Sequence, residues 1–185
     1  MDKKALILKS ALKLITENGF HGTPVSMISK DSGVAAGTIY LYFKNKEDIF
    51  DELYIYVKAD YNNAIVNGMY EGISVEDEYH LKWTNMVKYL INNPAEAKYI
   101  EQYLTSPSAN KVLIKDKLEK CAELRDLYKR AIISGVIRNI SYETVITTML
   151  GTVNQLFRMH NSDILNIDEK IIEEVFHLFW IGIKK

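Results

Sequence analysis

Cysteine, proline and glycine are scarce in this chain of 185 residues, which holds one cysteine, three prolines and nine glycines. A single cysteine cannot form an intramolecular disulfide or a CxxC zinc site, so Cys121 is expected to be a small core residue. A β-sandwich or barrel needs many turns, and so few turn-forming residues argue against both. Because 48% of the residues are hydrophobic, enough for a buried core, we expect a fold of long helices.

An apolar stretch long enough to span a membrane is also missing, as is a signal-peptide pattern at the N-terminus. We therefore expect a cytoplasmic protein with no membrane partner. The four histidines show no HExxH, HxH or cysteine-paired spacing, and the sequence contains no GxSxG motif, phosphate loop or dinucleotide fingerprint. The sequence accordingly predicts neither an enzyme nor a metal or other cofactor.

Charge is distributed unevenly along the chain. Residues 1–46 hold seven lysines and three acidic residues, a net charge of +4, although the whole chain has a net charge of −1. A basic segment is a candidate for binding a polyanion. Many solvated helical faces carry a similar excess, so charge alone leaves nucleic-acid binding as one interpretation among several.

Apolar periodicity and capping residues divide the chain into about nine helices. The Thr23 hydroxyl is expected to accept a backbone N–H at the start of the second helix, with Pro24 at its first helical position. The other expected N-caps are Asn45, Ser74, Ser141 and Asp168. The expected helices cover residues 3–18, 23–32, 36–43, 46–70, 74–92, 94–104, 111–134, 141–160 and 168–183.

Residues 23–43 have the pattern of a helix-turn-helix motif, which by itself is moderately specific. Gly33 suits the left-handed conformation that ends the first helix of the motif, and Val34 can fill the angle between the two helices. Ile39 and Phe43 are expected to face the core. The rest of the second helix is then free to contact a partner.

Three stretches carry a resemblance to the TetR/AcrR repressor family: Ala-Leu-Lys-Leu-Ile at 11–15, Gly-Phe-His-Gly-Thr at 19–23, and Gly-Thr-Ile-Tyr-Leu-Tyr-Phe-Lys-Asn-Lys-Glu at 37–47. The resemblance covers roughly residues 5–53, and the remainder is similar in layout only. It implies an all-α fold with a helix-turn-helix DNA-binding domain at residues 1–46 and a ligand-binding and dimerisation domain at residues 47–185. It also implies a homodimer formed through the last two helices, a palindromic DNA operator, and a small-molecule effector that releases the DNA.

Hydroxyls and cations of the motif are expected to contact DNA phosphates, as family counterparts of Thr38, Tyr40, Tyr42 and Lys46 often do. Ser26 is either a phosphate ligand or a solvated hydroxyl. Gly37 lets the helix backbone approach DNA closely, unless it is required for packing between helices. The expected DNA-binding residues are Ser26, Ala36, Gly37, Thr38, Tyr40, Leu41, Tyr42 and Lys46.

Several positions depart from the usual family pattern. Ala35 replaces a capping serine or threonine, and Ser29 and Ser32 replace small apolar residues. No arginine, glutamine or asparagine lies between residues 33 and 43, so the strongest bidentate base readers are missing. Specificity is expected to rest on DNA shape and on methyl contacts from Ala36, Thr38 or Leu41.

Aromatic and methionine side chains of the body are candidates for an apolar ligand cavity, with ordinary core packing as the alternative. The expected ligand-binding residues are Trp83, Met86, Tyr99, Tyr103, Tyr128, Met149 and Phe157. The last two helices are apolar on two sides, which suggests one face for a dimer partner, with burial inside one chain as the alternative. The expected interface residues are Leu150, Phe157, Ile172, Phe176, Trp180 and Ile183.

The interpretation that accounts for the most residues is a ligand-responsive repressor. An all-α enzyme or carrier with an incidentally basic N-terminus is an alternative, and the helix-turn-helix pattern argues against it. A third possibility keeps the DNA-binding motif but makes the body a protein-interaction module without a small-molecule effector.

Overall fold

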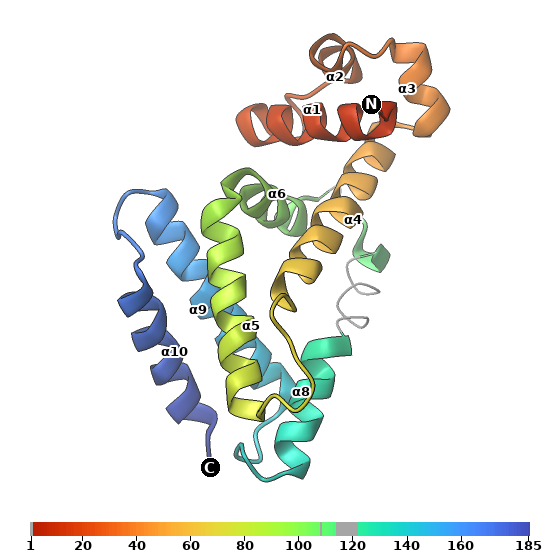
Figure 1. Ribbon diagram of the computed structural model, residues 1–185. Coiled ribbons are helices and arrows are strands. Elements are labelled where there is room, and N and C mark those ends of the chain that lie inside the picture. Colours follow the sequence, from red (N-terminus) through yellow and green to blue (C-terminus); the bar gives the residue numbers. More distant parts are fainter. Residues whose placement is uncertain (1, 108, 114–121) are drawn as a thin grey trace. The chain divides into compact units, whose positions relative to one another are not determined.

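The computed structural model of the chain describes residues 2–107, 109–113 and 122–185. Within these ranges it is helical, and the only extended pairing is an isolated antiparallel bridge between Ile137 and Lys184. This confirms the predicted all-α fold. Cys121 and the middle of the helix expected over 111–134 lie outside the described residues. The helices, labelled in Figure 1, are α1 (Lys3–Asn18), α2 (Val25–Ser32), α3 (Ala36–Tyr42), α4 (Lys46–Ile65), α5 (Val75–Asn92), α6 (Pro94–Thr105), α8 (Ala122–Ile133), α9 (Tyr142–Asn161) and α10 (Glu169–Ile183).

Four of the expected N-caps have the hydrogen bonds that define them. Asp48 N donates to Asn45 Oδ1 at 2.7 Å, and Asp77 N donates to Ser74 Oγ at 3.1 Å. The side chains of Ser141 and Asp168 likewise accept backbone N–H groups at the starts of α9 and α10. These caps confirm the predicted beginnings of α4, α5, α9 and α10.

The expected start of α2 was wrong. The Thr23 hydroxyl does not cap α2 but donates to the Gly19 carbonyl at 2.8 Å, at the end of α1. Pro24 is itself the N-cap residue, and the helix begins at Val25. Thr23 is completely buried, and its hydroxyl is satisfied by the carbonyl of the residue that caps the preceding helix.

Helix α4 ends at Ile65, five residues before its expected end at residue 70. The Asn85 amide donates to the carbonyls of Ile65 and Asn67 at 3.0 and 2.8 Å. These bonds satisfy acceptors that a helix end leaves open. The signal for this ending therefore lies in α5, twenty positions away, rather than in the local sequence.

The chain divides into two compact units. Unit 1 consists of Met1–Asp60 and Asn93–Lys117, and unit 2 consists of Tyr61–Asn92 and Leu118–Lys185. This division differs from the expected segments 1–46 and 47–185, because the first part of α4 and the whole of α6 group with α1–α3. Helix α1 packs against α2, α3 and α6 within unit 1.

Tyrosines of α6 explain why this helix belongs to unit 1. The Tyr99 hydroxyl donates to the Phe50 carbonyl at 2.6 Å, and the Tyr103 hydroxyl donates to the Asp51 carboxylate, both on α4. The Phe20 ring lies 4.9 Å from Phe50 and 6.0 Å from Tyr99, between centroids. Burial in this shared core raises the pKa of both tyrosines above the ordinary value, so their hydroxyls remain protonated hydrogen-bond donors.

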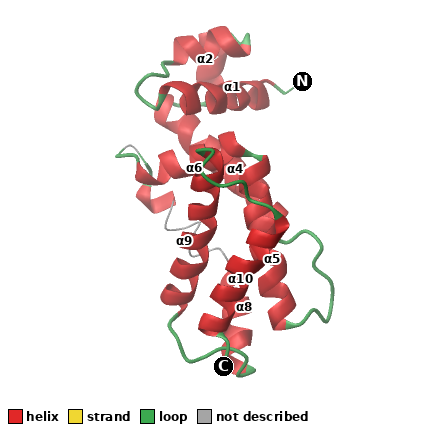
Figure 2. Cartoon of the chain, turned by 90° about the vertical axis from the view of Figure 1, so that its left-hand side faces the viewer, coloured by secondary structure: helices red, strands yellow, loops and turns green. Residues whose placement is uncertain are grey.

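Unit 2 is built around α5, which packs against α8, α9 and α10. Figures 1 and 2 both show α5 and α10 side by side. Trp83 of α5 stacks on Phe179 of α10 with 5.4 Å between ring centroids, and Tyr79 contacts Trp180 at 5.5 Å. The core of unit 2 is therefore largely aromatic between these two helices.

Candidate nucleic-acid interface

The turn between α2 and α3 is held by side-chain hydrogen bonds. Gly33 ends α2 in the left-handed region, with φ 70° and ψ 10°, and Val34 is buried behind it. Ser29 Oγ donates to the Val34 carbonyl at 2.7 Å, and Val34 N donates to Ser32 Oγ at 3.2 Å. The two serines, which depart from the family pattern, fix the angle between the helices of the motif.

Helix α3 turns one side inward and leaves the other open to solvent. Ile39 and Phe43 are buried, as expected from the sequence, and pack into the core of unit 1. Six of the eight expected DNA contacts are exposed, and Thr38 and Lys46 are half-buried. The exposed six are Ser26, Ala36, Gly37, Tyr40, Leu41 and Tyr42.

Gly37 is not required by the packing of the protein. Its φ is not positive, and a Cβ built on it would meet no atom within 4 Å. The alternative that Gly37 serves helix packing therefore finds no support. A glycine inside a helix lowers stability by about 0.5–1 kcal/mol relative to alanine. The presence of Gly37 therefore favours a role in contact with a partner molecule.

The start of α4 carries a reciprocal cap next to Lys46. Lys44 N donates to Asp48 Oδ2 at 2.8 Å, while Asp48 N donates to Asn45 Oδ1. The Lys46 ammonium lies 5.4 Å from the centroid of the Phe50 ring, which orients its side chain along α4. Lys46 is thereby held at the first turn of a helix, where backbone N–H groups also favour an anion.

Two of the lysines in the basic segment are occupied by ion pairs within unit 1. Lys4 binds Glu52 of α4 at 2.8 Å, and Lys13 binds Asp31 of α2 at 2.7 Å. The hydrogen bond from Lys13 lowers the pKa of Asp31, and the same bond raises the pKa of Lys13. These lysines position α1 rather than remaining free for phosphates.

Two exposed lysines near the motif are not among the residues expected to contact DNA. Lys30 lies in the last turn of α2, and Lys44 lies between α3 and α4. Both are exposed, and their ammonium groups pair with no acidic group in the described part of unit 1. The charge excess of residues 1–46 contained this signal, but spacing alone did not show which lysines were already paired.

The expected ligand-binding residues are divided between the two units. Tyr99 and Tyr103 belong to the core of unit 1, where they hold α6 to α4. Trp83, Met86 and Met149 are fully buried in unit 2, while Phe157 is buried and Tyr128 half-buried there. The seven residues are therefore not brought together in one unit.

The interior of unit 2 contains buried charged and polar groups. Lys82 is 1% exposed and binds the equally buried Glu78 at 2.7 Å, whose other carboxylate oxygen accepts from Arg130 at 2.5 Å. Tyr79 Oη, Trp83 Nε1 and Trp180 Nε1 are buried and have no hydrogen-bond partner in the described residues. Burial also raises the pKa of Tyr79, which keeps its hydroxyl protonated.

The residues predicted for the dimer interface lie mainly in the interior of unit 2. Ile172, Phe176, Trp180 and Ile183 are buried within one chain, as is Phe157, and Leu150 is half-buried. These residues pack α10 and α9 against the rest of unit 2, so they do not form an exposed face. On the other side of α10, Leu178 is 66% exposed and Ile181 is also exposed, whereas Ile171 and Val175 are half-buried.

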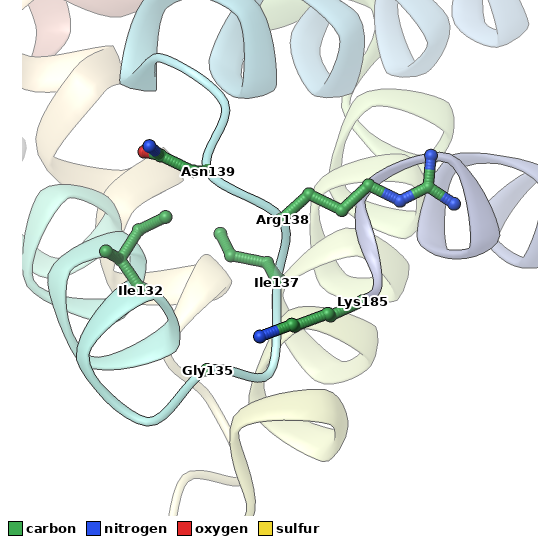
Figure 3. Close-up of a pocket in the computed structure, with 6 residues that line it drawn as sticks. All are labelled: Ile132, Gly135, Ile137, Arg138, Asn139 and Lys185. Atoms are coloured by element: carbon green, nitrogen blue, oxygen red, sulfur yellow. The ribbon is translucent and has the colours of Figure 1, made fainter.

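A pocket of about 330 Å³ lies at the connection between α8 and α9 in unit 2. In Figure 3, Ile132 and Ile137 face each other across it, whereas Arg138 extends away toward the last helix. The Arg138 guanidinium donates to the carbonyls of Ile181 and Lys184 at 3.4 and 2.8 Å. None of the expected ligand-binding residues lines this pocket.

Among the described helices, none combines the length and apolar character needed to cross a membrane.

Comparison with known proteins gives matches over both parts of the chain. Residues 7–53 match bacterial regulatory proteins of the tetR family, and residues 75–184 match a tetracyclin repressor-like C-terminal domain. An uncharacterised HTH-type transcriptional regulator of Haemophilus influenzae is 25% identical over 181 residues, covering 97% of this chain and 94% of the relative. The fatty acid metabolism regulator protein of Bacillus subtilis is 58% identical over 48 residues, covering 26% of this chain and 25% of that relative.

A solved structure with the same fold comes from Bacillus subtilis. It is the transcriptional regulator FadR in complex with stearoyl-CoA, and it is 25% identical with a TM-score of 0.77, covering 96% of this chain and 98% of that one. The exposed outer side of α3 and the turn before it thus lie in the segment that matches the regulators' N-terminal domain, and the second match spans more than half of the chain. The chain belongs to the TetR family of bacterial regulatory proteins.

Proposed function

We propose that this chain is a homodimeric transcriptional repressor, which binds a palindromic DNA operator through α3 and releases it when a small molecule binds unit 2. The observation that carries the proposal is the orientation of α3. Its apolar residues Ile39 and Phe43 are buried, and the opposite side faces solvent. A helix of seven residues is about 10 Å long and fits a major groove about 12 Å wide.

The neighbouring residues supply phosphate contacts on this proposal. The Tyr42 hydroxyl is exposed at the end of α3, and Lys46 follows at the N-terminus of α4. Exposed Lys30 and Lys44 add cations whose interaction with DNA does not depend on base sequence. Phosphate contacts of this kind set the register in which α3 meets the bases.

A duplex selected by the protein from a random pool tests DNA binding. Tyr42→Ala and Lys46→Ala are each expected to weaken binding by about 1.5–3 kcal/mol, the range of hydrogen bonds to charged groups. Tyr70→Ala is the matched control, because Tyr70 is an exposed tyrosine of unit 2. Loss of affinity in the control as large as in Tyr42→Ala would contradict the assignment, as would selection of no duplex at all.

The exposed apolar stripe of α10 supports the dimer. Ile171, Val175 and Leu178 follow one another at helical spacing; Leu178 and the nearby Ile181 are exposed, and Ile171 and Val175 are half-buried. Thr148, Gly151 and Gln155 form an exposed side of α9 with little bulk. A second copy that packs on these faces buries the stripe through a two-fold interface, which matches a palindromic operator.

Sedimentation tests the interface. Leu178→Glu is expected to give monomers, since it places a charge in the centre of the proposed apolar contact. Lys170→Glu changes charge at an exposed position of the same helix outside the stripe and is the control. An unchanged sedimentation coefficient for Leu178→Glu would reject this face as the interface.

Unpartnered donors inside unit 2 support a small-molecule effector. Two indole N–H groups, Trp83 Nε1 and Trp180 Nε1, can only donate, and Tyr79 Oη lies in the same aromatic core. A ligand that suits them is apolar and carries acceptor oxygens. Acyl-CoA compounds meet this description, and the FadR structure was solved with stearoyl-CoA.

The chain's two tryptophans make the effector testable by intrinsic fluorescence. Titration with stearoyl-CoA is expected to change the emission of Trp83 and Trp180 and to release the selected duplex. Coenzyme A without an acyl chain is the control. If stearoyl-CoA changes neither signal, acyl-CoA is excluded as the effector, and a body that binds a protein partner becomes the favoured alternative.

A further inference from the structure

Leu41 lies at the centre of the outer side of α3. Successive residues of an α-helix are about 100° apart, so side chains two positions away point to nearly opposite sides. Ile39, two positions before Leu41 within α3, is 0% exposed, and Phe43, which directly follows the helix, is 1% exposed, whereas Leu41 is 84% exposed. No other large apolar side chain in the described part of unit 1 is as exposed.

Exposure alone does not assign a role, because single apolar side chains are common on protein surfaces. The second observation is Gly37, four positions before Leu41 and therefore on the same side of the helix, one turn away. Apart from its chain neighbours and the backbone of its own helix, no atom lies within 4 Å of the position that a Gly37 Cβ would take, and its φ does not require glycine. The outer side of α3 thus combines an open position with a protruding leucine.

Helix α3 lacks the side chains that usually recognise bases through hydrogen bonds. The helix reads Ala-Gly-Thr-Ile-Tyr-Leu-Tyr and contains no charged or amide side chain. Thr38 is half-buried, and the hydroxyls of Tyr40 and Tyr42 lie at the ends of long side chains on either side of Leu41. The residue that points straight outward can therefore make only apolar contacts.

One group in the major groove is apolar and projects from a base edge, the 5-methyl group of thymine. We infer that Leu41 is a specificity-determining residue that recognises this methyl group, and that Gly37 lets the backbone of α3 come close enough for the contact. The inference rests on the proposed DNA binding and adds the identity of a recognised base. It requires at least one thymine in each half-site whose methyl group is indispensable.

Replacing thymine by uracil removes this methyl group and leaves base pairing intact. In a duplex selected by the wild-type protein, each symmetric pair of dT residues is replaced by dU in turn. One pair is expected to lose about fourfold in affinity per half-site, the value of one buried methylene, and so about 16-fold for the dimer. All other pairs should change binding little.

The variant Leu41→Ala identifies the side chain responsible. It is expected to bind the dT duplex more weakly than the wild type does and to show no further loss with dU at the critical pair. Its melting temperature should equal that of the wild type because Leu41 is exposed. The variant Gly37→Ala is expected to weaken binding to the dT and dU duplexes.

Three outcomes separate the possibilities. A selected duplex that tolerates dU at every position overturns the assignment of Leu41 while DNA binding stands. Equal dU sensitivity in Leu41→Ala and the wild type also overturns it and assigns the methyl contact to another residue. If the wild-type protein selects no duplex, the proposed function fails and this inference fails with it.

Discussion

The two compact units bury different kinds of groups. The buried polar side chains of unit 1, Ser10 and Thr23, are both uncharged and both donate to backbone carbonyls. Unit 2 buries the charged pair Glu78 and Lys82. In the described part of the chain, most buried side-chain atoms without a hydrogen-bond partner also lie in unit 2. Those atoms in unit 2 belong to Asn62, Tyr79, Trp83, Thr84 and Trp180.

The contrast matches where each unit carries its candidate binding groups, which lie on the surface of unit 1 and in the interior of unit 2. Unit 1 presents its candidate contacts on the outside, so the buried hydroxyls of Ser10 and Thr23 can be satisfied within its core at no cost to binding. Unpartnered donors inside a core cost stability, and they are retained where another requirement outweighs that cost. The comparison therefore predicts that related substitutions have opposite consequences in the two units.

The largest effect is expected from breaking the buried ion pair of unit 2. Glu78→Leu leaves the Lys82 ammonium buried without its carboxylate and should lower the free energy of unfolding by about 3–5 kcal/mol. The double variant Glu78→Leu with Lys82→Met removes both charges and should recover most of the loss. Urea unfolding at fixed protein concentration measures both, and a double variant as unstable as the single one would contradict this account.

Removing one hydroxyl from each unit sharpens the comparison. Tyr103→Phe takes a donor from Asp51 and an acceptor from Asn110 N, so the free energy of unfolding should fall by about 1–2 kcal/mol. Tyr79→Phe removes an unpartnered hydroxyl and should raise it by up to about 1 kcal/mol. Thermal and urea unfolding measure whether each variant lowers or raises the free energy of unfolding. If Tyr79→Phe destabilises the protein, the Tyr79 hydroxyl has a hydrogen-bond partner in the folded state.

Two glycines of unit 1 distinguish a folding requirement from a binding one. Gly33→Ala places a side chain at φ 70° and should destabilise the protein by about 1 kcal/mol. Gly37→Ala should stabilise it by about 0.5–1 kcal/mol, since alanine favours the helix and nothing obstructs its Cβ. Melting temperatures test both, and a destabilised Gly37→Ala would restore the packing explanation for this glycine.

The smallest effect concerns the exposed pair of Lys13 and Asp31. The hydrogen bond from Lys13 lowers the pKa of Asp31 in the folded state. Asp31 therefore stabilises the folded protein at pH values above its unfolded pKa, about 3.9. This stabilisation is lost as the pH falls through the lower folded-state pKa. Asp31→Asn should therefore change stability slightly at neutral pH and not at all in strong acid. Solvent and salt screen such surface pairs, so a large salt-independent effect would contradict the assignment.

Much of the helical pattern was predictable from the sequence, as was the burial pattern of the candidate nucleic-acid interface. Caps such as Asn45 and Asp168 act on neighbouring N–H groups, and the buried positions Ile39 and Phe43 follow from helical spacing. The end of α4, the grouping of α6 with unit 1, and the pairing of Lys4 and Lys13 were not predictable. Each of these depends on a partner far along the chain.

The proposed dimer face illustrates the same limit. Both sides of α10 are apolar, so periodicity could not decide whether Phe176 and Trp180 or Val175 and Leu178 face inward. Packing decides it, because the aromatic rings of Tyr79 and Trp83 on α5 cover the Phe176 and Trp180 side. The remaining side is left for a second copy on our proposal.

The sequence by itself determined the helical class, most helix starts and the family resemblance of the motif, because periodicity, caps and short motifs act within a few residues. Only the tertiary structure decided which apolar faces are covered, which lysines are already paired, that Gly37 has open space beside it, and that Leu41 points straight outward. The physical reason is that burial and charge pairing are set by atoms brought together from distant parts of the chain.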